Sequence, residues 1–389
     1  MMTPRENLLS VFRHEKPDWI PVTGHVDPYN KPRDDGHLPP ELVETLKKVK
    51  WSDESTVRVS RYLGLDIADW YGPPLKREPG AGVTMEILRE GEDVTTRWHT
   101  PAGTLRQVAR RLPGGSTTSL VEHAIKTAAD LPAFAYLFEA ERITVDVERL
   151  ADLQRRRAMI GEDGIILFPM PGTPLGMLVR IHAGVETTSY LCADAPEALR
   201  DLFRVMEANH RRQFELAAPM AGDGLVGIDD TSTTTISPAM FEAYCLDYTD
   251  RMAEVAHAAG KLYLHHSCGL IRDLVGLYRQ TKMDAVHALQ VPPIGDITIR
   301  EAKKALGPRI AMIASLVQLM GSFEDWESVK RSLCDMVDGA APGDNLILGL
   351  APDPNKTLEE TARLRAELKP LQRRYAGPQP PIQAWRSIR

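Results

Sequence analysis

Short apolar runs alternate with longer helical patterns over the last two-thirds of the chain, and this alternation constrains the fold more than any other feature. The runs that we interpret as strands cover residues 164–168, 224–228, 262–264, 285–286, 310–314 and 346–348. Between them lie helical patterns of about 10 to 20 residues, such as 195–218 and 237–259. This order of elements predicts a parallel sheet with right-handed crossovers and helices on its outside.

The number of these units favours a closed barrel. A short strand at residues 19–22 adds to the series, and with about eight strand–helix units we predict a distorted (β/α)8 TIM barrel. We predict a single domain over residues 1–389. A doubly wound open sheet is the alternative, but no Gly-x-Gly-x-x-Gly follows the first strand to support a dinucleotide fold.

Residues 83–112 have a different pattern. Apolar and polar residues alternate there, with turn signals near Gly91 and Gly103. A period of two with such turns predicts a small antiparallel β meander inserted near the N-terminus. Two further helices are predicted over residues 3–14 and 41–50, the first with Thr3 as its N-cap.

Composition excludes several classes of function. The net charge is −6 and no long Lys/Arg block occurs, so nucleic-acid binding has no electrostatic support. We expect the short basic run Arg155–Arg157 to lie on a solvated helix face. No run of 18 apolar residues predicts a membrane span, and the N-terminus lacks the apolar centre of a signal peptide. Four widely spaced cysteines favour reduced thiols and a cytoplasmic location. The oligomeric state stays open, with a homodimer as one alternative.

The strand at residues 262–264 leads into the most informative residues for chemistry. The segment Lys261–Gly269 ends in His-His-Ser-Cys-Gly. In an extended chain His266 and Cys268 lie on the same side, because side chains alternate with period two. An imidazole and a thiol at a barrel strand's end suit zinc binding or acid–base chemistry. A catalytic zinc needs three protein ligands, so this pair is half a site, and a structural histidine beside a buried thiol is the alternative.

Other polar side chains also follow predicted strands, and in a barrel they converge on one mouth. We predict acid–base roles for Asp230 and His287. The residues predicted to contact substrate are His25, Met170, Asp229 and Gln290, and Asp66 and Asp69 are expected at the same mouth. Adjacent carboxylates point in opposite directions in an extended chain, so only one of Asp229 and Asp230 is expected to face the cavity.

Several motifs together resemble the uroporphyrinogen decarboxylase-like superfamily, which also contains the cobalamin-dependent methyltransferases. The resemblance spans nearly the whole chain and rests on residues 2–22, 100–105, 228–238, 264–269, 290–296 and 306–310. It implies a distorted (β/α)8 barrel. The decarboxylase grips a polycarboxylated tetrapyrrole with an arginine-rich stretch near the first strand, where this chain reads Pro-Val-Thr-Gly-His-Val-Asp-Pro. The resemblance therefore favours the methyltransferase branch.

In that branch the resemblance implies a zinc held by a His-x-Cys pair and a later cysteine. His266 and Cys268 match the pair, but residues 348–353, where the later cysteine is expected, contain none. The coordination shell of the zinc would then be completed by His287, by a carboxylate such as Asp230 or Glu186, or by a water.

The implied reaction moves a methyl group between a small molecule and a thiol or corrinoid acceptor, with zinc activating the nucleophile. The chain has no Asp-x-His-x-x-Gly motif, so the corrinoid would be carried by a partner protein. Two alternatives stay open at this point: a decarboxylase or lyase that uses His266, His287 and Asp230 for acid–base chemistry, and a non-catalytic barrel that binds a small molecule.

Overall fold

A computed structural model describes residues 2–24, 53–112, 118–316, 325–350 and 358–374. Its central element is a sheet of eight parallel strands, in the order β1-β14-β13-β12-β11-β10-β9-β2. The strands are β1 (Val22–Gly24), β2 (Ile67–Trp70), β9 (Gly164–Pro171), β10 (Gly224–Ile228), β11 (Leu262–His266), β12 (Ala285–Leu289), β13 (Ala311–Ser315) and β14 (Leu346–Leu350).

The two edge strands, β1 and β2, meet through Asp66. Its backbone N–H donates to the carbonyl of Val22 at 2.9 Å, and its carboxylate accepts the N–H of Val22 at 2.9 Å. The sheet is therefore a nearly closed barrel, and the predicted (β/α)8 fold is confirmed. The same contacts place Asp66 beside the first residue of β1, not at the mouth where we expected it. Because Asp66 is buried, its pKa is raised to about 6.

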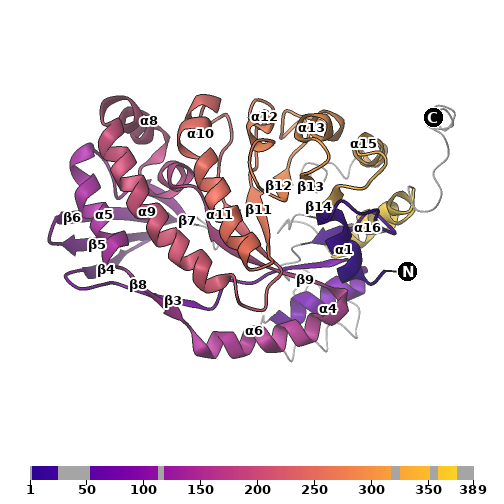
Figure 1. The fold of residues 1–389 in the computed structure, drawn as a ribbon, viewed down its shortest axis with the longest axis horizontal. Coiled ribbons are helices and arrows are strands. Elements are labelled where there is room, and N and C mark those ends of the chain that lie inside the picture. The colour runs from indigo at the N-terminus through magenta and orange to yellow at the C-terminus, as the bar shows by residue number, and fades with distance from the viewer. Residues whose placement is uncertain (1, 25–52, 113–117, 317–324, 351–357, 375–389) are drawn as a thin grey trace.

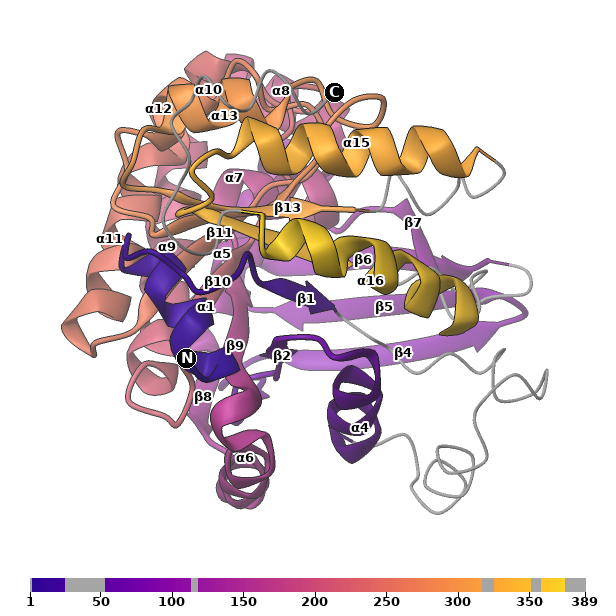
Figure 2. The same cartoon turned by 90° about the vertical axis from the view of Figure 1, so that its right-hand side faces the viewer.

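Helices surround this barrel (Figures 1 and 2). They are α4 (Asp53–Leu63), α6 (Val147–Ile160), α7 (Pro174–Met177), α8 (Gly184–Asp194), α9 (Pro196–Ala217), α10 (Pro238–Tyr244), α11 (Leu246–Ala258), α12 (Val275–Tyr278), α13 (Ile299–Leu306), α15 (Trp326–Gly339) and α16 (Leu358–Gln372). No described helix is long and apolar enough to cross a membrane.

Three predicted helices differ from the observed ones. The segment 237–259 is two helices that meet at Cys245, and the segment 270–280 is reduced to the single turn α12. The segment 175–183 begins as α7 and continues as a π-helical turn, Leu178–His182. The helix predicted at residues 41–50 lies outside the described residues.

The N-terminal helix α1 (Pro4–Phe12) closes the end of the barrel at which the strands begin. Thr3 caps it, with its side chain accepting from the N–H of Glu6. Leu8 and Phe12 pack with the inward side chains of the strands' first residues, including Ile165 and Ala311. The amino ends of the described strands are therefore packed against α1, and Leu8, Phe12 and Ile165 also line the cavity inside the barrel.

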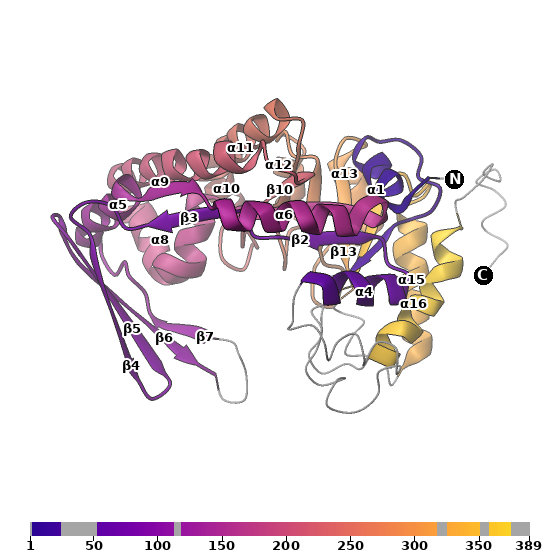
Figure 3. The same ribbon diagram turned by 90° about the horizontal axis from the view of Figure 1, so that it is seen from below.

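The β insertion lies between β2 and α6. It contains β3 (Leu75–Glu78), β4 (Thr84–Glu90), β5 (Asp93–Thr100), β6 (Gly103–Arg111), β7 (Thr118–Glu122), α5 (Leu131–Ala140) and β8 (Arg142–Val145). Strands β4 to β7 form the predicted antiparallel meander, one strand longer than predicted, and β3 pairs with β8. Because the insertion leaves the carboxyl end of β2, it belongs to the side of the barrel where active sites form. Figure 3 shows the meander projecting away from the barrel.

The basic run in α6 is not a uniformly solvated face. Only Arg155 has a largely exposed side chain. Arg156 is buried and forms a two-point ion pair with Asp69, and Arg157 bonds to Asp223 at 3.1 Å. Asp69 therefore points outward from the barrel toward α6, which corrects our expectation that it faces the mouth.

Asp284 connects the end of α11 to the first residues of β11. Its carboxylate accepts the N–H of Tyr263 at 2.7 Å and lies 2.9 Å from Nε2 of His257. The hydrogen bond to Asp284 raises the pKa of His257. The stabilisation by the charged pair is therefore fully present below the unfolded-state pKa of histidine, about 6.5, and is lost as the pH rises through the higher folded-state value.

We expect His257→Gln to destabilise the protein more at pH 5.5 than at pH 9. The pair is partly exposed and screened by solvent, so the difference should be about 0.2–1 kcal/mol. Urea unfolding of both proteins at the two pH values measures it. An equal loss at both values would mean that the charge of His257 contributes nothing.

Candidate active site

The last residues of β11 bring the predicted pair of soft ligands to the barrel interior. Leu264 packs in the inner core, whereas Tyr263 packs in the outer core beneath the helices. This alternation turns His266 inward and His265 outward. Cys268, two residues further on, lines the same cavity as His266.

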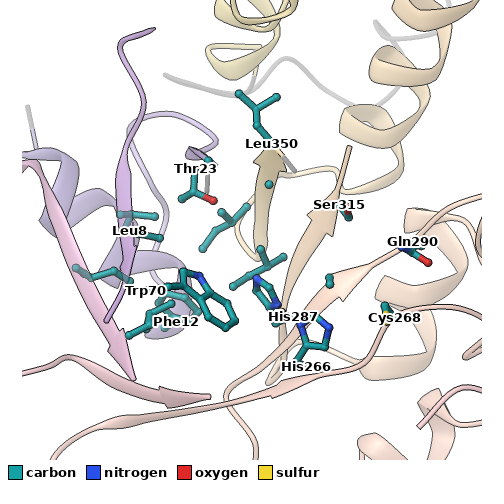
Figure 4. Close-up of a pocket in the computed structure, with 18 residues that line it drawn as sticks. Leu8, Phe12, Thr23, Trp70, His266, Cys268, His287, Gln290, Ser315 and Leu350 are labelled. Carbon is teal, nitrogen blue, oxygen red and sulfur yellow. Dashed lines mark hydrogen bonds between the residues drawn. The ribbon is translucent and has the colours of Figure 1, made fainter. Parts of the chain in front are cut away.

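That cavity has a volume of about 390 Å³ and lies inside the barrel, next to α1. Its floor includes Leu8 and Phe12 of α1, and its walls are mostly aliphatic. The polar side chains that line it are Thr23, His266, Cys268, His287, Gln290 and Ser315. Figure 4 shows them gathered toward the carboxyl ends of the strands, with Trp70 beside His287.

His266 and His287 form a pair at the centre of this group. They are register partners on β11 and β12, and their Nδ1 atoms are 2.8 Å apart. One Nδ1 must therefore donate and the other accept. When both rings are neutral, the donor ring keeps a lone pair on Nε2, and the acceptor ring carries its proton on Nε2. The pair thus combines one basic nitrogen with one N–H donor. The indole of Trp70 packs on His287, with ring centroids 4.7 Å apart.

Burial keeps His266 and Cys268 neutral. It lowers the pKa of His266 to about 4, with smaller contributions from His265 and Arg180. Burial also raises the pKa of the Cys268 thiol, and the charge of Asp230 adds to this effect. At neutral pH the cavity therefore holds a neutral His266 imidazole and a protonated thiol.

A network of buried hydrogen bonds on the outer side of β11 fixes the backbone that carries His266 and Cys268. The hydroxyl of Thr231 lies 3.1 Å from Nε2 of His265, 3.0 Å from the hydroxyl of Ser267 and 3.2 Å from the hydroxyl of Tyr278. Ser267 and Tyr278 are themselves 2.7 Å apart. Because Ser267 lies between His266 and Cys268 in the chain, the network ties their backbone to the loop after β10.

Two carboxylates after β10 have different environments. Asp229 is buried and accepts the N–H of Thr173 at 2.7 Å and that of Asp230 at 2.9 Å. It anchors the start of α7 and does not line the barrel cavity, so we no longer assign it to substrate binding. Asp230 is half-buried and lies outside the lining as well. Its pKa is raised by burial and by Asp229, and it acts on Cys268 through its charge.

Of the other residues predicted to contact substrate, one lines the cavity, one faces away from it and one lies outside the described residues. Gln290 lines the cavity, and its Oε1 accepts the N–H of Gly269 at 2.8 Å. Met170 belongs to the outer core, because the inward positions of β9 are those of Ile165 and Leu167. It faces the helices, which corrects the prediction that it contacts substrate. His25 lies outside the described residues, and Glu186 is exposed on α8.

Sequence reasoning missed Trp70, Thr23 and Ser315, which also line the cavity. Ser315 lies one residue beyond the strand predicted at 310–314, and period-two counting extended by that residue would have turned it inward. Trp70 ends a short strand, β2, for which we gave no range.

The described residues do not form a zinc site as they stand. Among them, no three His, Cys, Asp or Glu side chains lie close enough together to hold one metal ion. The two Nδ1 atoms of the histidine pair face each other at hydrogen-bond distance instead of a shared centre. We therefore derive no chemical step through a metal.

Comparison with known proteins places this fold in a family. Residues 3–353 match the family model described as uroporphyrinogen decarboxylase (URO-D). The chain belongs to the URO-D family. This confirms the resemblance inferred from the motifs. No curated protein sequence matches the chain.

One solved structure supports the fold of this URO-D family member. A methyltransferase from Methanosarcina mazei has a TM-score of 0.63 at 16% identity, covering 95% of this chain and 99% of that one. A D-psicose 3-epimerase from Clostridium cellulolyticum H10 has a TM-score of 0.35 at 14% identity, over 58% of this chain and 84% of that one. An exo-beta-1,4-mannosidase from an Opitutaceae bacterium has a TM-score of 0.40 at 11% identity, covering 93% of this chain and 61% of that one. At these identities the first likeness concerns the fold alone, and we draw nothing from the other two.

Proposed function

We propose that this URO-D family protein is a methyltransferase whose small, uncharged and largely apolar substrate binds inside the barrel. The observation that carries the proposal is the lining of the cavity. Its described residues include two histidines, a cysteine and a glutamine but no Arg, Lys, Asp or Glu. A polycarboxylated substrate would need several cationic partners. A methylated aromatic ether or amine needs mainly apolar walls and one group that handles a proton.

The histidine pair supplies that group. When a methyl group passes from an oxygen or nitrogen atom to an accepting thiol, a bond from sulfur to the methyl carbon forms as the bond to the leaving atom breaks. The leaving atom keeps the bonding electrons and gains a proton, and the thiol loses one. An Nε2–H in the His266–His287 pair is suited to donate this proton. The proton between the two Nδ1 atoms then shifts to the donating ring, and the free Nε2 of the other ring takes up the proton that the thiol loses, so the pair ends neutral. In the reverse direction the same protons move back along this path. The apolar walls exclude water, which favours transfer over hydrolysis.

The identity of the methyl carrier is a separate part of the proposal. The family resemblance supports a corrinoid on a partner protein, and it alone carries that part. Zinc is proposed on the same ground and on the soft donor atoms of His266 and Cys268. Elemental analysis tests the metal separately. About one equivalent of zinc that is lost in Cys268→Ala would support it, and zinc well below one equivalent after zinc is added would exclude it.

The reaction itself is tested with the purified full chain. Aryl methyl ethers and N-methylated aromatic amines are offered as donors with a thiol or a reduced corrinoid protein as acceptor, and demethylated products are identified by mass spectrometry. Turnover supports the proposal. Saturable binding of the donors without turnover would leave a non-catalytic barrel, and release of carbon dioxide from a small carboxylated substrate would favour a lyase. Either result contradicts methyl transfer.

A further inference from the structure

A second cavity lies outside the barrel, between the meander and α5. Its volume is about 330 Å³, and none of the residues that line it also lines the barrel cavity. Its walls come from β3, β5, β6 and α5, and from the last residue of the π-helical turn Leu178–His182. These segments belong to the insertion after β2 or follow β9, so the cavity is built from the same βα connections that surround the barrel mouth.

Aromatic rings form much of its surface. Trp98 comes from β5, and Phe134 and Phe138 come from α5, with the two phenyl centroids 5.3 Å apart. The imidazole of His182 packs on Phe134 at 4.7 Å. Rings at these separations already touch one another, so a further flat ring would pack beside them and not between them.

His182 also has an unmet hydrogen-bonding need. Its Nε2 is buried and has no hydrogen-bond partner in the structure. Burial lowers the pKa of His182 to about 3, so the ring is neutral. Buried polar nitrogens of this kind are rare, because most are bonded to protein, water or a bound molecule. Gln107 on β6 lines the same cavity and adds an amide that can donate and accept.

The charged groups around the cavity are already compensated. The guanidinium of Arg77 forms two hydrogen bonds with Glu141, at 2.9 and 3.1 Å. Glu78 forms an ion pair with Lys76 at 2.8 Å. No described charge in the lining is left for an ionic ligand, so these residues favour an uncharged occupant.

We infer that this cavity is a binding site for a small, uncharged aromatic molecule that carries a ring N–H or a hydroxyl group. The ring would pack against Trp98 and Phe134, and its polar group would bond to Gln107 or His182. This site is separate from the barrel cavity and goes beyond the methyl transfer proposed there.

Indole is the probe that tests this inference, because it has a flat ring and one N–H. Its binding to the full chain is measured by calorimetry and by saturation-transfer NMR. We expect Trp98→Ala to weaken binding roughly three- to tenfold, and Gln107→Leu to weaken it about fivefold. Val83→Trp places a larger side chain in the lining of the cavity and should abolish binding.

Two further variants are the controls. Ile87→Ala changes an exposed residue of the meander that does not line the cavity, and it should leave the affinity unchanged. Ala68→Phe fills the barrel cavity and should also leave it unchanged. Loss of binding in Ala68→Phe but not in Val83→Trp would assign indole to the barrel and overturn the inference. Absence of saturable binding to the unaltered protein would overturn it too. Neither result bears on methyl transfer.

Discussion

Replacement of Arg156 by alanine should lower the free energy of unfolding by about 3–5 kcal/mol. The guanidinium of Arg156 donates from Nε and Nη2 to both carboxylate oxygens of Asp69, and the two side chains are only 5% and 2% exposed. Removal of the cation leaves the carboxylate of Asp69 buried without its partner between β2 and α6. Urea denaturation at pH 7 measures the loss.

The neighbouring residue provides a matched control. Arg155 has a side chain that is 70% exposed and bonds to Asp152 at 2.6 Å on the same helix. Arg155→Ala should therefore change stability by less than about 1 kcal/mol. The double variant Arg156→Met with Asp69→Leu removes both charges and should recover most of the loss, because an apolar pair avoids the unpaired buried charge. Equal losses in Arg155→Ala and Arg156→Ala would contradict this account.

The same residues show where sequence reasoning stops. The barrel was predictable because each of its apolar strand runs is followed by helical periodicity, and both patterns are local. The run Arg155–Arg157 looks uniform in sequence, yet one member is solvated, one is buried and one bonds to Asp223. What distinguishes them is which strand lies beneath each position of α6, and that depends on packing between distant segments.

In the candidate site, too, some side-chain positions could be predicted from the sequence and others could not. His266, Cys268 and His287 line the cavity at inward positions that continue predicted strands. Gln290 lines it too, although period-two counting from His287 would turn it outward, because the register of β12 shifts at Ala288. Met170 was not placed on the correct face, because a shift of one residue in strand parity moves a side chain to the opposite face. The contribution of α1 to the cavity floor could not be predicted, since no local pattern tells where a terminal helix packs.

Replacement of either central histidine has the largest effect expected on activity. If the proposed methyl transfer is correct, His266→Ala and His287→Ala should each lower kcat by about 10²–10⁴-fold, the usual contribution of a positioned acid–base group. Each variant removes one of the two Nδ1 atoms that are 2.8 Å apart, so the remaining ring loses the partner that fixes its tautomer. Steady-state kinetics with the donor identified by the product assay measures the loss.

Because the two rings act as one unit, the effects should not add. The double variant should be little slower than either single one, as for residues that serve one proton transfer. His287→Gln keeps a hydrogen-bonding side chain but cannot exchange a proton, so it should bind the donor with nearly unchanged affinity and still lose most of kcat. His257→Gln, which alters the exposed pair with Asp284, is the matched control and should keep the full rate. If His287→Gln instead keeps kcat and raises KM, the pair positions substrate and the proton is handled by another group.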